Sequence, residues 1–432
     1  MQTLKSNIED KKPAEKRKPL LHNFSAYSNI TEQYASESAF LWLLRSQAVT
    51  SSLYTTVDII EFEERIEANL RGLSSTGEHG WQACVEQLQY EEAGEVFTAA
   101  VVALRSRNAT QIKMVCELAL RTAEMTKGLV SALAWVESEI AEFWIQRFLS
   151  VTDPVYKELG LAVCGARRDY PEKYLLAILK EPTTVQNPAL HSRALRLIGE
   201  LKRWELVPAL NAAMDADDPQ VRFWANWSAA LMGNLAAINN LKPWILEDSV
   251  LSNKAVQLVF STLPIVESRS WVAAMVQKPE LNRLTIKAIG VLGDPQAIPW
   301  LIQIMDKPNY ARIAGWAFCQ ITGIDLEKTN LTVEPPEGDN QGPTDDAEDD
   351  NVAMDVDEDL LWPDKNKVAR LWQVHNRLLQ PGQRYFQGQE VTKQLLDNIY
   401  VNANQHQKEL AALQRAIHDK HTAFVNTKAR II

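Results

Sequence analysis

The side chains with the clearest potential for metal chemistry are three histidines near the end of the sequence. His418 and His421 are three residues apart, so they share one face if this segment is a helix, and His406 lies upstream. Such a pair binds a transition metal when a third ligand converges on it. The nearest carboxylate, Asp419, points to another face of the same helix. We therefore interpret these histidines as solvated side chains and predict no metal.

Three carboxylates in the first half of the chain have the residue type needed for acid–base catalysis. Glu137, Glu139 and Glu142 lie beside Trp135 and Trp144. Paired carboxylates in different surroundings can divide the roles of acid and base. The same spacing is typical of a solvated helix face, which is the interpretation we favour. Phosphate-binding glycine loops, nucleophile elbows and the His-Glu-x-x-His motif do not occur in the sequence. We therefore predict no catalytic residues and no cofactor.

Tryptophan is abundant, at 13 in 432 residues, and five tryptophans are candidates for binding a partner. Trp244, Trp271 and Trp300 come early in the second helices of the repeat described next, and Trp224 and Trp227 share one face of a first helix. Tryptophan is enriched at binding hot spots. Second helices usually line the concave face of such stacks, so we expect the first three tryptophans there. Packing in the core is the alternative interpretation for all five.

These tryptophans belong to a helical repeat that begins near residue 150. Its apolar anchors are Val155, Leu190, Val221, Leu251, Leu281 and Ala311, and the last four intervals are 30 or 31 residues. Apolar or small residues follow each anchor at +4, +5 and +8, which is one face of a helix. A second apolar segment completes each unit. Two helices per unit are therefore predicted, and stacked pairs bury their apolar faces in one continuous core.

Prolines and glycines mark where these helices begin and end. Pro208, Pro243 and Pro299 stand near the start of the second segments, and Gly233, Gly293 and Gly323 stand twelve residues after an anchor. Proline is tolerated in the first turn of a helix, and glycine adopts the positive φ of a helix C-cap. Overall Gly is scarce, at 17 residues, which also favours helices.

The repeat units resemble the HEAT-like repeat family over about residues 90–325. The residues that carry the resemblance are the V-R-x-x-A pattern at Val221, Arg222 and Ala225 and the closing Ile-Gly and Leu-Gly pairs. The resemblance implies an all-α solenoid. The domains that we expect are a disordered basic N-terminus over 1–36, a helical N-terminal cap over 37–89, HEAT-like repeats over 90–331, an acidic disordered linker over 332–359 and a C-terminal helical extension over 360–432.

Charge is distributed unevenly along the chain, whose formal net charge is -10. Residues 334–359 hold 12 acidic residues and no basic one, whereas the extension over 360–432 holds 11 Lys+Arg against 5 Asp+Glu. The acidic balance of the rest predicts no nucleic-acid partner, because coating nucleic acid needs a basic surface. One hypothesis is that the acidic linker folds back over the basic extension and competes there with an anionic partner.

Targeting signals and cysteines bear on the compartment. The polar start of the sequence lacks the apolar core of a secretory signal, and no apolar window is long enough to span a membrane. The four cysteines are far apart and lie in apolar helical segments, which favours buried thiols over disulfides or metal ligands. We therefore expect a cytoplasmic protein without a membrane partner.

The flanks of the repeat carry a narrower resemblance. FEERIEANLRGLSSTGEHGW, ITGIDLEKTNL, the acidic spacer, LWPDKNKVARLW and PGQRYFQGQEVT follow one another in this order. The chain resembles an uncharacterised bacterial family of HEAT-like proteins that are often encoded near type VI secretion clusters. That resemblance implies a secretion accessory, an effector partner or an immunity role, without implying a mechanism.

The leading hypothesis for function is a non-enzymatic scaffold that binds one protein on an extended concave surface. A secreted effector or a component of the secretion system would be that partner, and the chain would be its adaptor, chaperone or immunity protein. The alternative is an enzyme on a HEAT-like scaffold, similar to a bilin lyase or a DNA glycosylase. The acidic repeats argue against the glycosylase, since its groove is basic. Bilin lyases have no simple sequence motif, so the absence of a motif does not exclude that class of enzyme.

Overall fold

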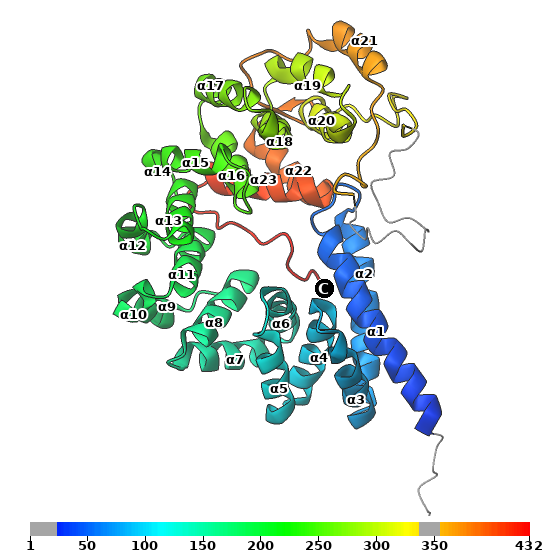
Figure 1. Cartoon of the computed structure of the whole chain (residues 1–432), viewed down its shortest axis with the longest axis vertical. Helices are drawn as coiled ribbons and strands as arrows, with labels where there is room; N and C mark the ends of the chain where they lie inside the picture. The colour runs from blue at the N-terminus through cyan, green and yellow to red at the C-terminus, as the bar shows by residue number, and fades with distance from the viewer. Residues whose placement is uncertain (1–23, 337–354) are drawn as a thin grey trace, which may run out of the picture.

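Paired helices follow the expected repeat over most of the chain. The structure is a computed structural model that describes residues 24–336 and 355–432 (Figure 1). The first helices of the pairs are α4 (Ala93–Ser106), α6 (Ala123–Trp135), α8 (Pro154–Arg167), α11 (Pro188–Leu201), α13 (Pro219–Leu231), α16 (Ser252–Thr262), α18 (Asn282–Leu292) and α20 (Pro308–Thr322). The second helices are α5 (Ala109–Ala119), α7 (Ser138–Ser150), α9 (Glu172–Lys180), α12 (Val207–Ala213), α14 (Leu235–Asn240) with α15 (Lys242–Ile245), α17 (Ile265–Val276) and α19 (Ile298–Ile304). Short turns of helix complete the connections: α10 (Pro182–Val185), η1 (Leu88–Tyr90), η2 (Trp204–Leu206), η3 (Pro279–Leu281) and η4 (Pro295–Ala297).

Side chains at the starts of the helices explain the regular boundaries. Asp153, Asn187 and Asp218 each accept a backbone N–H in the first turn of the helix that follows. Such caps satisfy donors that have no partner within the helix. The prolines expected in the second helices do lie in their first turns. Local signals in the sequence therefore set the helix ends.

Stacking of the pairs builds one core, as the repeat predicts. A single cluster of buried apolar residues runs from Ala35 to Ala416. Neighbouring first helices approach closely at small residues: a Cβ on Gly199 would lie 2.5 Å from the Cβ of Ser228, and one on Gly128 would lie 2.2 Å from the carbonyl oxygen of Ala93. The fold is therefore an all-α solenoid whose repeats share a continuous core.

Three helices cap the first repeat: α1 (Phe24–Ala48), α2 (Thr56–Ser75) and α3 (Glu78–Gln87). The expected boundary between a disordered 1–36 and a cap over 37–89 is wrong, because α1 already begins at Phe24. Thr31 and Ala35 continue the buried face of Ala39, which packs against α4, so the helix is already packed on the repeats before residue 37. Residues 1–23 lie outside the described residues.

The acidic linker is ordered at both ends. Thr332 forms an isolated antiparallel bridge with Pro363, and the carboxylates of Asp355 and Asp357 pair with Arg312 of α20 and Arg283 of α18. The expectation of disorder over 332–359 is therefore wrong at these ends. Asp355 and Asp357 thus pair with repeat helices, and Asp359 accepts a hydrogen bond from Ser51 between α1 and α2. That the linker folds back over the basic extension stays a prediction. Its centre, residues 337–354, lies outside the described residues.

The C-terminal extension completes the last repeat and then leaves the helical pattern. Its first helix, α21 (Lys365–His375), packs on α19, and Trp372 meets the ring of Phe318 edge-on at 6.3 Å between centroids. A two-stranded antiparallel hairpin follows, formed by β1 (Tyr385–Phe386) and β2 (Gln389–Glu390) with Tyr385 opposite Glu390. The sequence predicts a helical extension over 360–432, and this prediction is wrong at the hairpin.

Two glycines let this hairpin dock on the ends of the repeat helices. Gly293 ends α18 with a φ of 72°, and its carbonyl accepts the N–H of Tyr385 at 2.8 Å. Gly323 ends α20 with a φ of 69°, against Gln387. A Cβ at Gly293 would lie 2.2 Å from the carbonyl oxygen of Tyr385. The spacing of these glycines predicts helix caps, and the close approach of the hairpin adds a second reason for glycine.

The end of the extension joins the two ends of the arc. Helices α22 (Lys393–Asn402) and α23 (Gln405–His418) pack together, and α23 contacts α16. The N–H of Gln405 donates to the carbonyl of Tyr54 at 2.8 Å, in the turn between α1 and α2. Residues 419–432, here called the inner segment, then cross the inside of the arc without helical structure (Figure 1). The arc is thereby closed by its own chain.

Candidate interaction surfaces

The inner side of the arc is formed by the first helices of the repeat pairs. In Figure 1, helices α6, α8, α11, α13 and α16 face the centre, while second helices such as α5, α12, α14 and α17 lie outside. This is the reverse of the expectation that second helices line the concave face. The physical reason is that the first helices are apolar on several faces, as in α13, where Phe223–Leu231 are all buried. Such helices need a cover on their inner side, and the C-terminal extension provides it.

The inner segment binds the first helices through backbone and side-chain hydrogen bonds. Phe424 donates its N–H to the carbonyl of Glu200 at 3.0 Å and accepts from Nε of Arg168 at 2.6 Å. Further along, Nδ2 of Asn426 donates to the carbonyl of Ala166 at 2.8 Å. The segment therefore occupies the groove in which a solenoid would hold an extended ligand.

Glu200, on α11, organises the middle of the inner face. Its carboxylate is 1% exposed and pairs with Arg193 at 2.6 Å, Arg196 at 2.8 Å and Arg168 at 3.4 Å. Burial alone would raise the pKa of Glu200, but the three guanidinium groups prevail and lower it to about 2. The signal for this cluster in the sequence is the spacing of Arg193, Arg196 and Glu200 along one face of a repeat helix.

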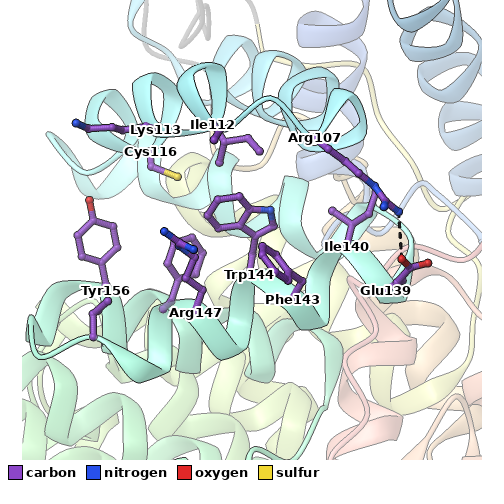
Figure 2. A pocket seen from close by; sticks show the side chains of 13 residues that line it. Arg107, Ile112, Lys113, Cys116, Glu139, Ile140, Phe143, Trp144, Arg147 and Tyr156 are labelled. Atoms are coloured by element: carbon purple, nitrogen blue, oxygen red, sulfur yellow. Dashed lines mark hydrogen bonds and ion pairs between the residues drawn. The ribbon is translucent and has the colours of Figure 1, made fainter.

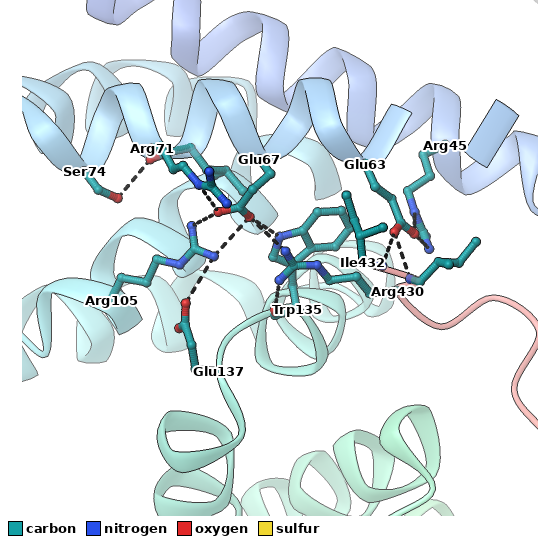
Figure 3. Close-up of polar contacts among 12 residues, drawn as sticks. Arg45, Glu63, Glu67, Arg71, Ser74, Arg105, Trp135, Glu137, Arg430 and Ile432 are labelled. Carbon is teal, nitrogen blue, oxygen red and sulfur yellow. Dashed lines mark hydrogen bonds and ion pairs between the residues drawn. The ribbon is translucent and has the colours of Figure 1, made fainter. Parts of the chain in front are cut away.

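The last residues of the inner segment are held by Glu63 of α2. Its carboxylate is fully buried and pairs with Arg45 of α1 at 2.6 Å. The other carboxylate oxygen accepts the N–H groups of Ile431 and Ile432 at 2.8 and 3.1 Å (Figure 3). One buried charge thus joins the N-terminal cap to the end of the inner segment.

A second carboxylate of α2 completes this attachment. Glu67 lies 3.1 Å from Arg71, 3.1 Å from Arg105 and 3.2 Å from Arg430 of the inner segment (Figure 3). It also accepts the indole N–H of Trp135 at 3.1 Å. Burial opposes ionisation of Glu67, but these hydrogen bonds and charges lower its pKa below the ordinary value.

The two first-helix tryptophans lie beneath the inner segment. Trp224 is 8% exposed and carries the guanidinium of Arg196 at 4.4 Å from its ring centroid. Trp227 is 4% exposed and lies 6.0 Å from the ring of Phe424. Both rings therefore contact this chain's own residues. Their binding of another protein stays a prediction, and it would require the inner segment to move.

The three second-helix tryptophans lie on the outer side of the arc instead of the concave face. Trp271 is buried in α17, and Trp244 and Trp300 are half-buried. The ring of Trp244 meets Phe223 at 5.4 Å, which fits a packing role. Trp300 lines a hollow of about 300 Å³ together with Val272. The structure does not bring these three rings together with Trp224 and Trp227.

A larger hollow, here called the outer groove, lies between α5, α7 and the start of α8. Its volume is about 700 Å³, and its apolar lining comes from Ile112, Ile140, Phe143, Trp144, Phe148 and Tyr156 (Figure 2). Phe143 is 59% exposed, and its ring meets Trp144 edge-on at 5.5 Å. The signal for it in the sequence was Phe143 itself, which lies off the buried face of α7 that Ala141 and Ile145 define.

Charged side chains form the rim of the outer groove. Arg107 pairs with Glu139 at 3.2 Å, while Lys113 and Arg147 also line the opening. Arg147 lies over the ring of Trp144 at 5.7 Å. The rim therefore carries three basic groups and one acidic group. The lining thiol, Cys116, is not a nucleophile at neutral pH, because burial raises its pKa to about 12.

The residues considered for catalysis do not converge. Glu137 pairs with Arg105 at 3.5 Å, Glu139 is taken by Arg107, and Glu142 is exposed on α7. Glu137 and Glu139 thus bind separate arginines, and the three carboxylates do not form an acid–base pair with one another.

The histidines are also separate. Helix α23 ends at His418, so His421 lies beyond it and the expected shared helix face does not exist. His406 is packed against the ring of Trp316 at 4.9 Å. Within 24–336 and 355–432, no three His, Cys, Asp or Glu residues stand close enough to hold a metal ion. Cys84, Cys116 and Cys164 are free and buried, as expected from their apolar surroundings, whereas Cys319 is free and only partly buried.

Paired helices stacked in an arc over one core define the class of protein as an α-solenoid. More particularly, the family model for HEAT repeats matches residues 173–258, from α9 into α16. The search of curated proteins and the search of solved structures gave no match. Repeat arrays of this class commonly act as scaffolds for protein interactions. In the part of the chain that the structure describes, no helix combines the length and apolar character needed to cross a membrane.

Proposed function

We propose that this chain is a non-enzymatic scaffold that binds its protein partner in the outer groove. The observation that carries the proposal is the exposed ring of Phe143 above a 700 Å³ apolar hollow, on a solenoid whose inner face is already covered. Aromatic side chains at such positions are typical of binding hot spots. The hollow also falls in the volume range of ligand pockets in proteins.

The rim indicates what kind of segment fits. Arg107 is paired with Glu139, and Lys113 with Glu117. Arg147 has no carboxylate partner among the described residues, so an acidic group on the partner would meet its positive charge. We propose that the partner contributes an amphipathic segment with apolar side chains toward Phe143 and acidic residues at its edges. A helix laid into an apolar groove is a common form of such recognition.

The flank motifs support a cytoplasmic role beside a type VI secretion system. LWPDKNKVARLW and PGQRYFQGQEVT carry that resemblance. The partner would then be a secreted effector, and the chain its adaptor or its immunity protein. An immunity protein neutralises one toxin stoichiometrically. An adaptor is needed for export of that toxin and not for survival of sister cells.

Replacing Phe143 with Asp is expected to abolish partner binding, because it places a charge in the apolar groove. Loss of one hot spot costs about 2 kcal/mol or more, roughly 30-fold in affinity. Phe40→Asp is the matched control, since Phe40 of α1 is also 59% exposed. Wild-type and variant chains would be cross-linked in the native cell, captured, and compared by mass spectrometry.

The proposal predicts one co-purifying protein that survives in Phe40→Asp and is lost in Phe143→Asp. Its cross-links should map to α5 and α7. Equal recovery with both variants, at unchanged melting temperature, would rule out the outer groove as the docking surface.

A further inference from the structure

The geometry points to a second site, on the inner face, that binds a small oxyanion of the phosphate class carrying two or more negative charges. This inner cavity has a volume of about 560 Å³ and lies between α6, α8, α11 and the inner segment. The cationic side chains around it are Arg45, Lys127, Arg168, Arg193, Arg196, Lys428 and Arg430, and its one lining carboxylate is Glu200. The inference is independent of the outer groove.

Ion pairs do not neutralise this cavity. Glu200 is shared by Arg168, Arg193 and Arg196, which leaves two positive charges in excess at its centre. Lys428 has its own counter-ion in Glu409, at 3.5 Å.

Two other cations of the cavity are also paired. Arg45 is balanced by Glu63, and Arg430 shares Glu67 with Arg71 and Arg105. Arg105 also pairs with Glu137, so the excess of positive charge around Glu67 is smaller than that around Glu200. The cluster around Glu200 is therefore the positive centre of the cavity.

The surroundings of the cluster do not remove its excess charge. Glu158 of α8 attracts Arg193, and burial raises the pKa of this carboxyl above its ordinary value. Even when ionised, Glu158 would offset only one of the two excess positive charges. Lys254 of α16 is also repelled by this cluster. Burial, and then repulsion by Arg196, lower the pKa of Lys254 to about 8. A bound anion would relieve this repulsion.

Guanidinium N–H groups that form no hydrogen bond within the described residues are available to a ligand. Arg196 donates through Nε to Glu200, and neither of its Nη atoms forms a hydrogen bond with a described residue. Arg193 donates through Nη2 alone, again among the described residues. The Arg196 side chain is 34% exposed, so a solute can reach it. Guanidinium groups match the oxygens of phosphate two at a time, which favours this ligand class over a halide.

The walls of the cavity limit the ligand to a compact anion. Trp135 has Arg45 at 5.5 Å and Arg430 at 4.6 Å from its ring centroid, so guanidinium groups already use its faces. Stacking of a base on this ring is therefore not expected. Inorganic phosphate or pyrophosphate, or the phosphate end of a metabolite, fits the charge and the volume.

Calorimetric titration of the full chain with pyrophosphate tests the site. We expect saturable one-to-one binding that weakens at least tenfold in Arg196→Gln and in Lys428→Gln. Lys428 is 42% exposed, so its replacement serves where Arg196→Gln does not fold. The control is Arg370→Gln on α21, an exposed arginine at the far end of the arc with the same change in charge (Figure 1).

Parallel titrations with inorganic phosphate and with citrate show whether the site prefers phosphate or carboxylate ligands. Citrate binding more tightly than either phosphate would overturn the phosphate class in favour of carboxylates. Absence of pyrophosphate binding, or equal weakening by Arg370→Gln, would overturn the site itself, because the second result means unspecific attraction to positive charge.

Discussion

Glu200→Ala is expected to lower the free energy of unfolding by about 3–5 kcal/mol. The substitution removes the counter-ion that Arg168, Arg193 and Arg196 share, on a helix where Glu200 is 1% exposed. Three guanidinium groups would then repel one another without compensation. Burying a charge without its partner is among the costliest single changes in a protein. Chemical denaturation at neutral pH measures the effect.

The dependence of this effect on pH distinguishes charge from packing. The pKa of Glu200 is about 2 in the folded chain and has an ordinary value of 4.5. Its contribution to stability is therefore complete above about pH 4.5 and is lost as the pH falls toward 2. The difference between wild type and Glu200→Gln should shrink over that range. A difference that does not change with pH would contradict the charge-based explanation.

Glu63→Ala is expected to destabilise the chain by a similar amount, about 3 kcal/mol or more, and also to free the inner segment. It leaves Arg45, which is 5% exposed, without its counter-ion, and it removes the acceptor of the Ile431 and Ile432 N–H groups. Trypsin should then cut after Lys428 in the folded variant faster than in wild type. Limited proteolysis with mass spectrometry measures this rate.

The neighbouring residue supplies the control for that experiment. Glu64 lies on the same helix but is exposed, so Glu64→Ala should leave both stability and proteolysis near wild-type values. Faster cutting in both variants would mean that loss of a charge on α2, and not loss of the attachment by Glu63, frees the segment.

The repeats could be predicted because their signals are local. Anchors such as Val221 and Leu251, prolines such as Pro208 and glycines such as Gly293 each constrain a few neighbouring residues. These short-range rules determine where helices begin and end. The resulting solenoid with one continuous core agrees with the prediction.

The cover of the inner face could not be predicted in this way. The hydrogen bond from the N–H of Ile431 to Glu63 joins residues 368 positions apart, and no periodic pattern in the sequence predicts it. The side of the arc that each helix faces also depends on how successive pairs rotate, which no single repeat encodes. For this reason Trp244, Trp271 and Trp300 were expected on the wrong face.

The buried charged clusters are a second feature that the sequence did not predict. Carboxylates such as Glu200 and Glu63 look like solvated residues when each helix is considered alone. Their burial follows only when the inner segment and its neighbours enclose them. The net charge of -10 likewise gives no sign of a cationic cavity, because the acidic residues of 334–359 hide the local excess of arginine.

Hydrogen–deuterium exchange of residues 419–432 in the intact chain tests most directly whether the inner segment occupies the concave face. The N–H of Phe424 donates to Glu200, and those of Ile431 and Ile432 donate to Glu63. We predict slow exchange at all three amides in wild type, and fast exchange at Ile431 and Ile432 in Glu63→Ala. Exchange of 419–432 at the rate of an unstructured peptide, while the repeat helices stay protected, would contradict the account.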